Sequence, residues 1–154
     1  MELIIIDCEA SGLEEDSYPI EVGVAFPYDS FGFLIKPHYS WNYWNEKSAK
    51  IHNIKREQLN QGLSIYDSVI KLNSQLRDSV VFSDAVDYEI FWLDKLFSVV
   101  GVERLFDIKS IYQLDFDFEI YKKEKIKMSK NIQIHRAEND ACLIRDSILK
   151  AINY

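Results

Sequence analysis

The chain has 154 residues, of which 47% are hydrophobic, and a formal net charge of −7. This size and composition predict one domain with a substantial core, spanning residues 1–154. No apolar run approaches the roughly 18 residues of a membrane helix, and the amino terminus does not resemble a signal peptide, so we expect a cytoplasmic protein. The acidic charge argues against tight nonspecific binding to long nucleic acid, but it permits a short nucleic-acid substrate held through metal ions.

The first predicted element is a buried strand with two acids at its end. Leu3 to Ile6 is an unbroken apolar run, which is typical of a strand buried on both faces. Asp7 and Glu9 continue this strand, two residues apart. Because side chains alternate along a strand, both carboxylates are expected on the same side.

The following segments predict a hairpin and then alternating helices and strands. The hairpin strands are expected at Ile20–Phe26 and Phe31–Ile35, with the turn at Pro27–Ser30. The later elements are expected, in chain order, as a short helix at Glu46–Ile51, a helix at Ser64–Leu76, a strand at Val80–Phe82, a helix at Tyr88–Val100, a strand at Leu105–Ile108 and a closing helix at Arg136–Ile152. This order indicates an α/β fold with a mixed sheet flanked by helices and with ligand-binding loops at the carboxyl ends of its parallel strands.

The closing helix carries a third acid within its apolar stripe. Small and apolar residues recur there at steps of three and four, which is the spacing of a core-facing helix surface: Ala137, Ala141, Ile144, Ile148 and Ala151. Asp140 lies within this stripe. Carboxylates that meet on buried faces repel one another and lose hydration, so they need a cation or protons. Oxygen ligands of this kind favour Mg²⁺ or Mn²⁺.

These residues carry a family resemblance. The triplet Asp7-Cys8-Glu9 is followed by Gly12-Leu13 and, one strand later, by residues 20–23 (Ile-Glu-Val-Gly); His135 stands five residues before Asp140. The combination resembles the DEDDh branch of the ribonuclease H-like 3′–5′ exonucleases, which includes ribonuclease T, oligoribonuclease and the proofreading exonuclease of DNA polymerase III. The resemblance covers nearly the whole chain. It implies a single exonuclease domain with a mixed five-stranded sheet.

The middle motif of that family admits two alignments here. The family usually has an aromatic residue and an aspartate at the start of a helix, with an apolar pair three and four residues after the aspartate. Glu89 fits if glutamate replaces aspartate, because Tyr88 precedes it and Trp92-Leu93 follow it. Asp87 fits as well and keeps the aspartate, with Ile90-Phe91 as the apolar pair. We favour Glu89, because the aromatic neighbour and the Trp-Leu pair both match.

The resemblance implies a two-metal site with a histidine base. Asp7 would bridge two Mg²⁺ or Mn²⁺ ions, Glu9 and Asp140 would complete the site of the water-activating ion, and Glu89 would hold the other ion. His135 would accept the proton of the attacking water. Five helical positions separate two side chains by about 140°, so His135 cannot converge with Asp140 from within the helix. We therefore expect His135 on the preceding loop.

Other candidates are less distinctive. Glu21 is interpreted as a structural residue or as a support for the site. His52 is interpreted as either structural or substrate-facing. Trp41 and Trp44 are interpreted as packing residues or as platforms on which bases stack. One basic run precedes His135 and is read as solvated, although its position would also let it touch phosphates: Lys122, Lys123, Lys125, Lys127 and Lys130.

The function expected from these features is a metal-dependent 3′–5′ exonuclease that releases nucleoside monophosphates. Its expected partners are single-stranded RNA or DNA 3′ ends and short oligonucleotides, with RNA or short oligonucleotides favoured; the oligomeric state is not set, and a homodimer stays open. Two alternatives remain. One is a nucleic-acid-binding module that keeps the fold and has lost turnover through its altered middle motif, and the other is a polymerase-associated proofreading subunit.

Overall fold

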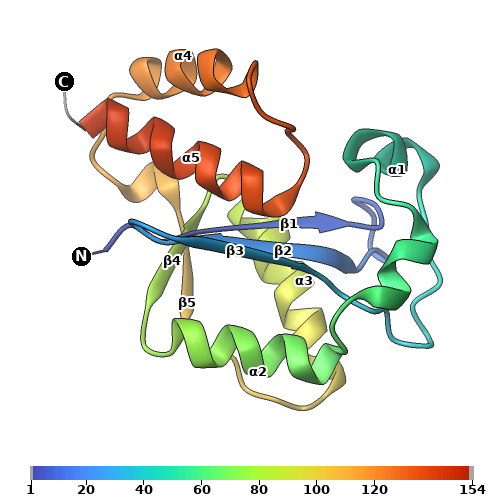
Figure 1. Cartoon of the computed structure of the whole chain (residues 1–154). Coiled ribbons are helices and arrows are strands. Elements are labelled where there is room, and N and C mark those ends of the chain that lie inside the picture. Colours follow the sequence, from blue (N-terminus) through green and yellow to red (C-terminus); the bar gives the residue numbers. More distant parts are fainter. Residues whose placement is uncertain (1, 153–154) are drawn as a thin grey trace.

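A computed structural model describes residues 2–152 and shows one five-stranded sheet with helices on both faces (Figure 1). The strands are β1 (Ile5–Ala10), β2 (Pro19–Ala25), β3 (Ser30–Leu34), β4 (Val80–Ser83) and β5 (Asp107–Ser110). Their order across the sheet is β3-β2-β1-β4-β5. The first three strands pair antiparallel, and β4 pairs in parallel with both β1 and β5. The predicted mixed five-stranded α/β fold is confirmed.

The central strand β1 runs beyond the end of its neighbour β4. Ile5 lies opposite Phe82, and β4 ends one residue later, at Ser83. On the other side, pairing with β2 continues along β1, with Glu9 opposite Glu21. The second half of β1 therefore has a strand on one edge only, and its other edge is open to groups from the start of the helix that follows β4.

Five α-helices and two short 3₁₀ turns complete the described chain. The helices are α1 (Glu46–His52), α2 (Ile65–Leu76), α3 (Val86–Val99), α4 (Phe118–Ser129) and α5 (Ala137–Ile152), and the 3₁₀ turns are Arg56–Gln61 and Ile111–Gln113. Local capping accounts for several helix starts. Asn45, Ser64 and Asp117 each accept backbone N–H groups of the first turn, which satisfies donors that a helix leaves unpaired. Among the described residues, no helix is long and apolar enough to cross a membrane.

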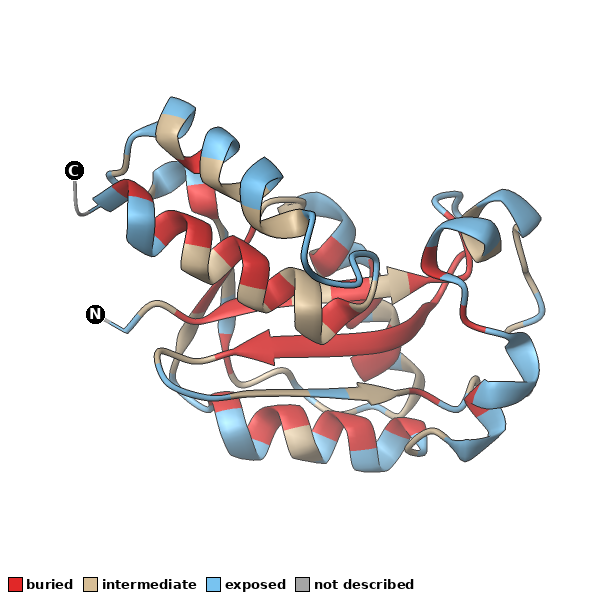
Figure 2. Cartoon of the chain, turned by 45° about the horizontal axis from the view of Figure 1, so that its top comes forward, coloured by how far each residue is buried: buried red, intermediate tan, exposed pale blue. Residues whose placement is uncertain are grey.

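The two faces of the sheet are covered by different helices. Ile6 of β1 packs in a cluster with Val69 of α2 and Leu93 of α3. Ile5 packs in a second cluster with Ala141 and Ile144 of α5. Helix α4 lies outside α5 (Figure 1), and its outer surface is mostly exposed, whereas β1, β2 and the sheet-facing side of α5 are mostly buried (Figure 2).

The contact between α5 and the sheet is unusually close at one glycine. A Cβ atom added to Gly23 of β2 would lie 2.1 Å from the carbonyl carbon of Ala137 and 2.2 Å from the nitrogen of Glu138. No side chain fits in that space, so glycine is required where the first turn of α5 meets the sheet. This approach brings the amino-terminal end of α5 to the carboxyl-terminal half of β1.

Several predicted boundaries are wrong. The first strand begins at Ile5 instead of Leu3; it continues through Asp7 and Glu9, as predicted, and ends at Ala10. Helix α3 begins at Val86, two residues earlier than expected, and β5 begins at Asp107 instead of Leu105. Helix α4 was not predicted, because its charged sequence buries only one residue, Tyr121.

Candidate active site

Asp7 and Glu9 stand on the α5 face of β1. They alternate with the buried residues Cys8 and Ala10 and share the face of Ile5, which packs against α5. Both acids are partly buried. Since α5 approaches β2 at Gly23, the first turn of α5 faces this pair of acids.

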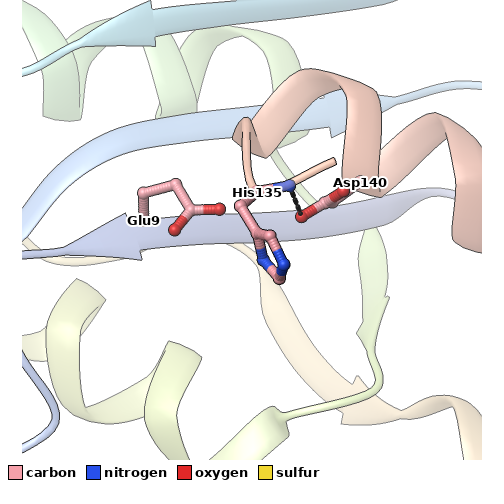
Figure 3. A group of neighbouring side chains, drawn as sticks. All are labelled: Glu9, His135 and Asp140. Atoms are coloured by element: carbon pink, nitrogen blue, oxygen red, sulfur yellow. Dashed lines mark hydrogen bonds between the residues drawn. The ribbon is translucent and has the colours of Figure 1, made fainter. Parts of the chain in front are cut away.

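The loop before α5 brings His135 to the same place. His135 is exposed, has a φ of 60° and lies two residues before the first residue of α5, as the sequence predicts. Its backbone N–H donates to Oδ2 of Asp140 at 2.9 Å. Ligand atoms of Glu9, His135 and Asp140 all lie within 4.8 Å of one another, and Figure 3 shows their side chains converging from β1, the loop and α5.

A partly buried ion pair anchors the start of α5. Glu21 of β2 accepts hydrogen bonds from Nε of Arg136 at 3.1 Å and from the backbone N–H of Ala137 at 2.7 Å. Nη2 of Arg136 completes the pair at 2.5 Å. Glu21 thus satisfies a donor at the helix start and holds the residue that follows His135, which agrees with a supporting role.

The structure distinguishes the two candidates for the middle acid. Glu89 is 1% exposed and lies on the buried stripe of α3 with Trp92 and Leu93, whereas Asp87 is exposed. Oε1 of Glu89 accepts the backbone N–H of Cys8 at 3.2 Å, on the edge of β1 that β4 leaves open. Oε2 of Glu89 is buried and has no hydrogen-bond partner in the described structure. The side chain of Glu89, and not that of Asp87, therefore reaches the strand of Asp7.

The electrostatics of the site follow from burial and from the mutual repulsion of these acids. Burial, then Glu89, Glu9 and Asp140 in that order, raise the pKa of Asp7 well above its usual range. Burial, with Asp140 next, raises the pKa of Glu9 to about 8. Burial also raises the pKa of Glu89 to about 8, against the effect of its hydrogen bond from Cys8. The site therefore holds protons at neutral pH unless a cation replaces them.

The donor set fits divalent cations. Asp7, Glu9 and Glu89 are partly or fully buried, and with the nearby Asp140 they offer carboxylate oxygens. Oε2 of Glu89 has no hydrogen-bond partner in the described structure. Carboxylate oxygens are the ligands that Mg²⁺ and Mn²⁺ prefer. Among the described residues, the close group of ligand atoms comprises Glu9, His135 and Asp140. Asp7 and Glu89 lie outside that group but act on each other electrostatically.

A cavity of about 350 Å³ opens beside these groups. Its acidic and basic lining residues are Asp7, Asp84, Lys125, His135 and Asp140. Asp84 was not predicted from the sequence, and Lys125 was predicted only as one of a basic run whose position would let it touch phosphates. Asp84 directly follows β4 as Asp7 follows the apolar part of β1, and this parallel is a signal that could have identified it.

His52, Trp41 and Trp44 lie outside this cavity. His52 is buried on α1; its Nδ1 accepts the backbone N–H of Ile54 at 3.0 Å, and its ring meets Trp44 edge-on with centroids 5.7 Å apart. Trp41 stacks on Tyr18 with centroids 5.3 Å apart. These contacts agree with the packing interpretation of all three residues.

Among the comparisons with known proteins, the one with solved structures finds matches. No protein-family model matches the sequence, and no curated protein matches it. Solved structures of Escherichia coli exonuclease I do match. The complex with a dA16 oligonucleotide has a TM-score of 0.72 at 10% identity, over 97% of this chain and 40% of the other. The complex with a dT13 oligonucleotide has a TM-score of 0.73 at 11% identity, over 96% and 40%.

A zinc-bound form of the E. coli exonuclease I complex with single-stranded DNA matches equally, with a TM-score of 0.70 at 10% identity, over 97% of this chain. This chain spans about 40% of the length of these proteins. At such low identity the likeness concerns the fold. The chain thus has the α/β fold of E. coli exonuclease I, with an acid cluster and a histidine gathered at the end of its central strand.

Proposed function

We propose that this chain is a metal-dependent 3′–5′ exonuclease that hydrolyses phosphodiester bonds at the 3′ ends of single-stranded RNA or DNA, or of short oligonucleotides, and releases nucleoside monophosphates. The observation that carries the proposal is the convergence of Glu9, His135 and Asp140 within 4.8 Å beside Asp7. These residues come from a strand, a loop and a helix that are far apart in the sequence. Acids with raised pKa values that gather in one cavity are a common mark of a catalytic site.

Each residue has a defined part in this reaction. When bound, two divalent ions would activate the attacking water and stabilise the leaving oxygen. Asp7 would contribute to both ion sites, Glu9 and Asp140 to the first, and the unpaired oxygen of Glu89 to the second. His135 is exposed on its loop, within reach of the first site, and would accept the proton of the attacking water.

The substrate class rests on two supports. The matched structures of E. coli exonuclease I hold dA16 and dT13 oligonucleotides, which supports a single-stranded substrate. The net charge of −7 favours short substrates held locally over long nucleic acid held by a basic surface. Both supports favour short single-stranded oligonucleotides, either RNA or DNA, as the substrate.

The test is hydrolysis of end-labelled RNA and DNA oligonucleotides in Mg²⁺, in Mn²⁺ and in EDTA. A 5′ label should show stepwise shortening, and a 3′ label should appear at once as a mononucleotide. Both should require the metal and should be lost in Asp7→Asn. Release of the 5′ nucleotide first would reverse the proposed polarity. Oligonucleotide binding without cleavage in either metal would identify a binding module instead. The replacement of aspartate by Glu89 in the middle motif would then explain the loss of turnover.

A further inference from the structure

An ion pair links helix α4 to the segment that follows β4. Nζ of Lys125 lies 2.6 Å from Oδ2 of Asp84, and the two side chains are 33% and 21% exposed. The residues are 41 positions apart in the sequence. Nζ of Lys125 also lies 5.7 Å from the ring centroid of Tyr121, one turn earlier on α4. The ammonium group is thus held in one place by contacts from two elements.

Lys125 differs from the other paired lysines of α4 in its partner and in its exposure to solvent. Lys122 and Lys127 pair with glutamates three positions earlier on the same helix, and their side chains are 48% and 72% exposed. Such pairs are worth little and leave the lysine in solvent. Lys125 instead points inward from the helix. Burial opposes its charge, but the carboxylate of Asp84 outweighs burial and raises the pKa of the ammonium group, which stays positive at every relevant pH.

The cavity around Lys125 is the proposed catalytic cavity. Asp7, His135 and Asp140 line the same space, and no other lysine or arginine of the described chain lines it. A phosphodiester strand that enters this cavity meets several carboxylates, which repel it. A fixed ammonium group offsets that repulsion, and it has three N–H donors, so it can keep Asp84 and still donate to a phosphate oxygen.

We propose that Lys125 binds a phosphate group of the substrate strand in this cavity, and that Asp84 holds the ammonium group in position. The proposal rests on the proposed function, because it assigns the substrate of the same site. Lys125 would act on binding, and therefore on KM, more than on the chemical step. It would also make part of the binding depend on salt, because a phosphate contact releases counterions.

The test compares Lys125→Gln, Lys125→Arg and Asp84→Asn with the wild type. Lys127→Gln is the matched control, since this lysine is on the same helix and its partner lies outside the cavity. Steady-state kinetics give KM and kcat separately. Fluorescence anisotropy in Ca²⁺ gives the Kd of a labelled single-stranded oligonucleotide and its dependence on salt. Thermal unfolding confirms that each variant is folded at the assay temperature.

We expect Lys125→Gln to raise KM and Kd about tenfold or more with little change in kcat, and Lys125→Arg to retain most of the binding. In a plot of the logarithm of the association constant against the logarithm of the salt concentration, the slope should become shallower by about 0.7 in Lys125→Gln. Asp84→Asn should change Kd much less than Lys125→Gln does, because the asparagine oxygen can still accept a hydrogen bond from Nζ of Lys125 and a negative charge leaves the cavity. Lys127→Gln should bind as the wild type does.

Two results would overturn the proposal. One is a Kd and a salt slope in Lys125→Gln equal to those of the wild type. The other is an equal weakening by Lys125→Gln and Asp84→Asn, which would mean that the pair only fastens α4 to β4. If the wild type cleaves neither RNA nor DNA, the proposed function fails, and the anisotropy measurements still decide whether Lys125 holds a phosphate.

Discussion

The backbone N–H of His135 donates a hydrogen bond to Oδ2 of Asp140 at 2.9 Å, and this bond closes the loop that enters α5. His135 has a left-handed φ of 60°, a conformation that costs free energy in residues other than glycine. The carboxylate of Asp140 compensates for that cost. One oxygen of Asp140 therefore positions the histidine, while the same side chain belongs to the close group with Glu9.

We expect Asp7→Asn and Asp140→Asn each to reduce turnover to less than about a tenth of the wild-type value, because each replaces a carboxylate of the proposed metal site. Both should fold. An asparagine at position 140 still offers an oxygen to the N–H of His135, and Asp7→Asn should raise the unfolding temperature without metal, since it removes a carboxylate that burial and its neighbours disfavour. Turnover measured in Mn²⁺ and thermal unfolding in EDTA test this. Activity near the wild-type level in either variant would refute the two-metal assignment.

His135→Asn should lower turnover by roughly 10²–10⁴-fold if His135 is the general base. Asparagine tolerates the left-handed backbone, so the loop should keep its shape. The Mn²⁺ concentration needed for half-maximal activity should change little, because the carboxylates of the site remain. Turnover equal to that of the wild type between about pH 6 and pH 9 would leave His135 as a loop residue only.

Glu89→Gln and Asp87→Asn form a matched pair that tests the middle acid. Each removes one negative charge and keeps the size of the side chain. Glutamine can still accept the N–H of Cys8, so we expect Glu89→Gln to raise the metal concentration needed for half-maximal activity without unfolding the protein. Asp87→Asn should behave as the wild type, because Asp87 is exposed. The reverse pattern in a metal titration would show that the aspartate is the true ligand.

Stability without metal should fall as the pH rises. The pKa of Glu9 is about 8 in the folded protein, above its ordinary value of 4.5, and Glu89 shows the same shift. Between those two pH values the folded protein holds protons that the unfolded chain has released, so the free energy of unfolding decreases with pH.

Thermal unfolding in EDTA should therefore give a lower Tm at pH 8 than at pH 5, and Mn²⁺ should raise the Tm more at pH 8, where bound ions replace the protons. Glu9→Gln should make the pH dependence in EDTA shallower, because one of the shifted groups is gone. A Tm in EDTA that rises from pH 5 to pH 8 would show that the acids are not held as the structure indicates.

Local patterns were enough to predict much of this protein. Alternation along a strand placed Asp7 and Glu9 on one side, and the stripe of small and apolar residues in α5 placed Asp140 toward the core. The rotation between His135 and Asp140 excluded a helical histidine. The residues one helical turn beyond the apolar pair also favour Glu89 over Asp87. Positions seven and eight after Glu89 are Leu96 and Phe97, both buried, whereas the corresponding positions after Asp87 are charged.

The sequence by itself thus determined the order of most elements, the mixed sheet and the faces on which the acids lie, because hydrophobic periodicity is a local property of the chain. Only the tertiary structure decided which groups meet. Helix α4 packs mainly on α5 and buries a single side chain of its own, so its sequence carries almost no apolar stripe. The pair of Asp84 with Lys125 depends on that packing. It joins a residue that directly follows β4 to a residue of α4, 41 positions apart, and no spacing in the sequence encodes such a contact.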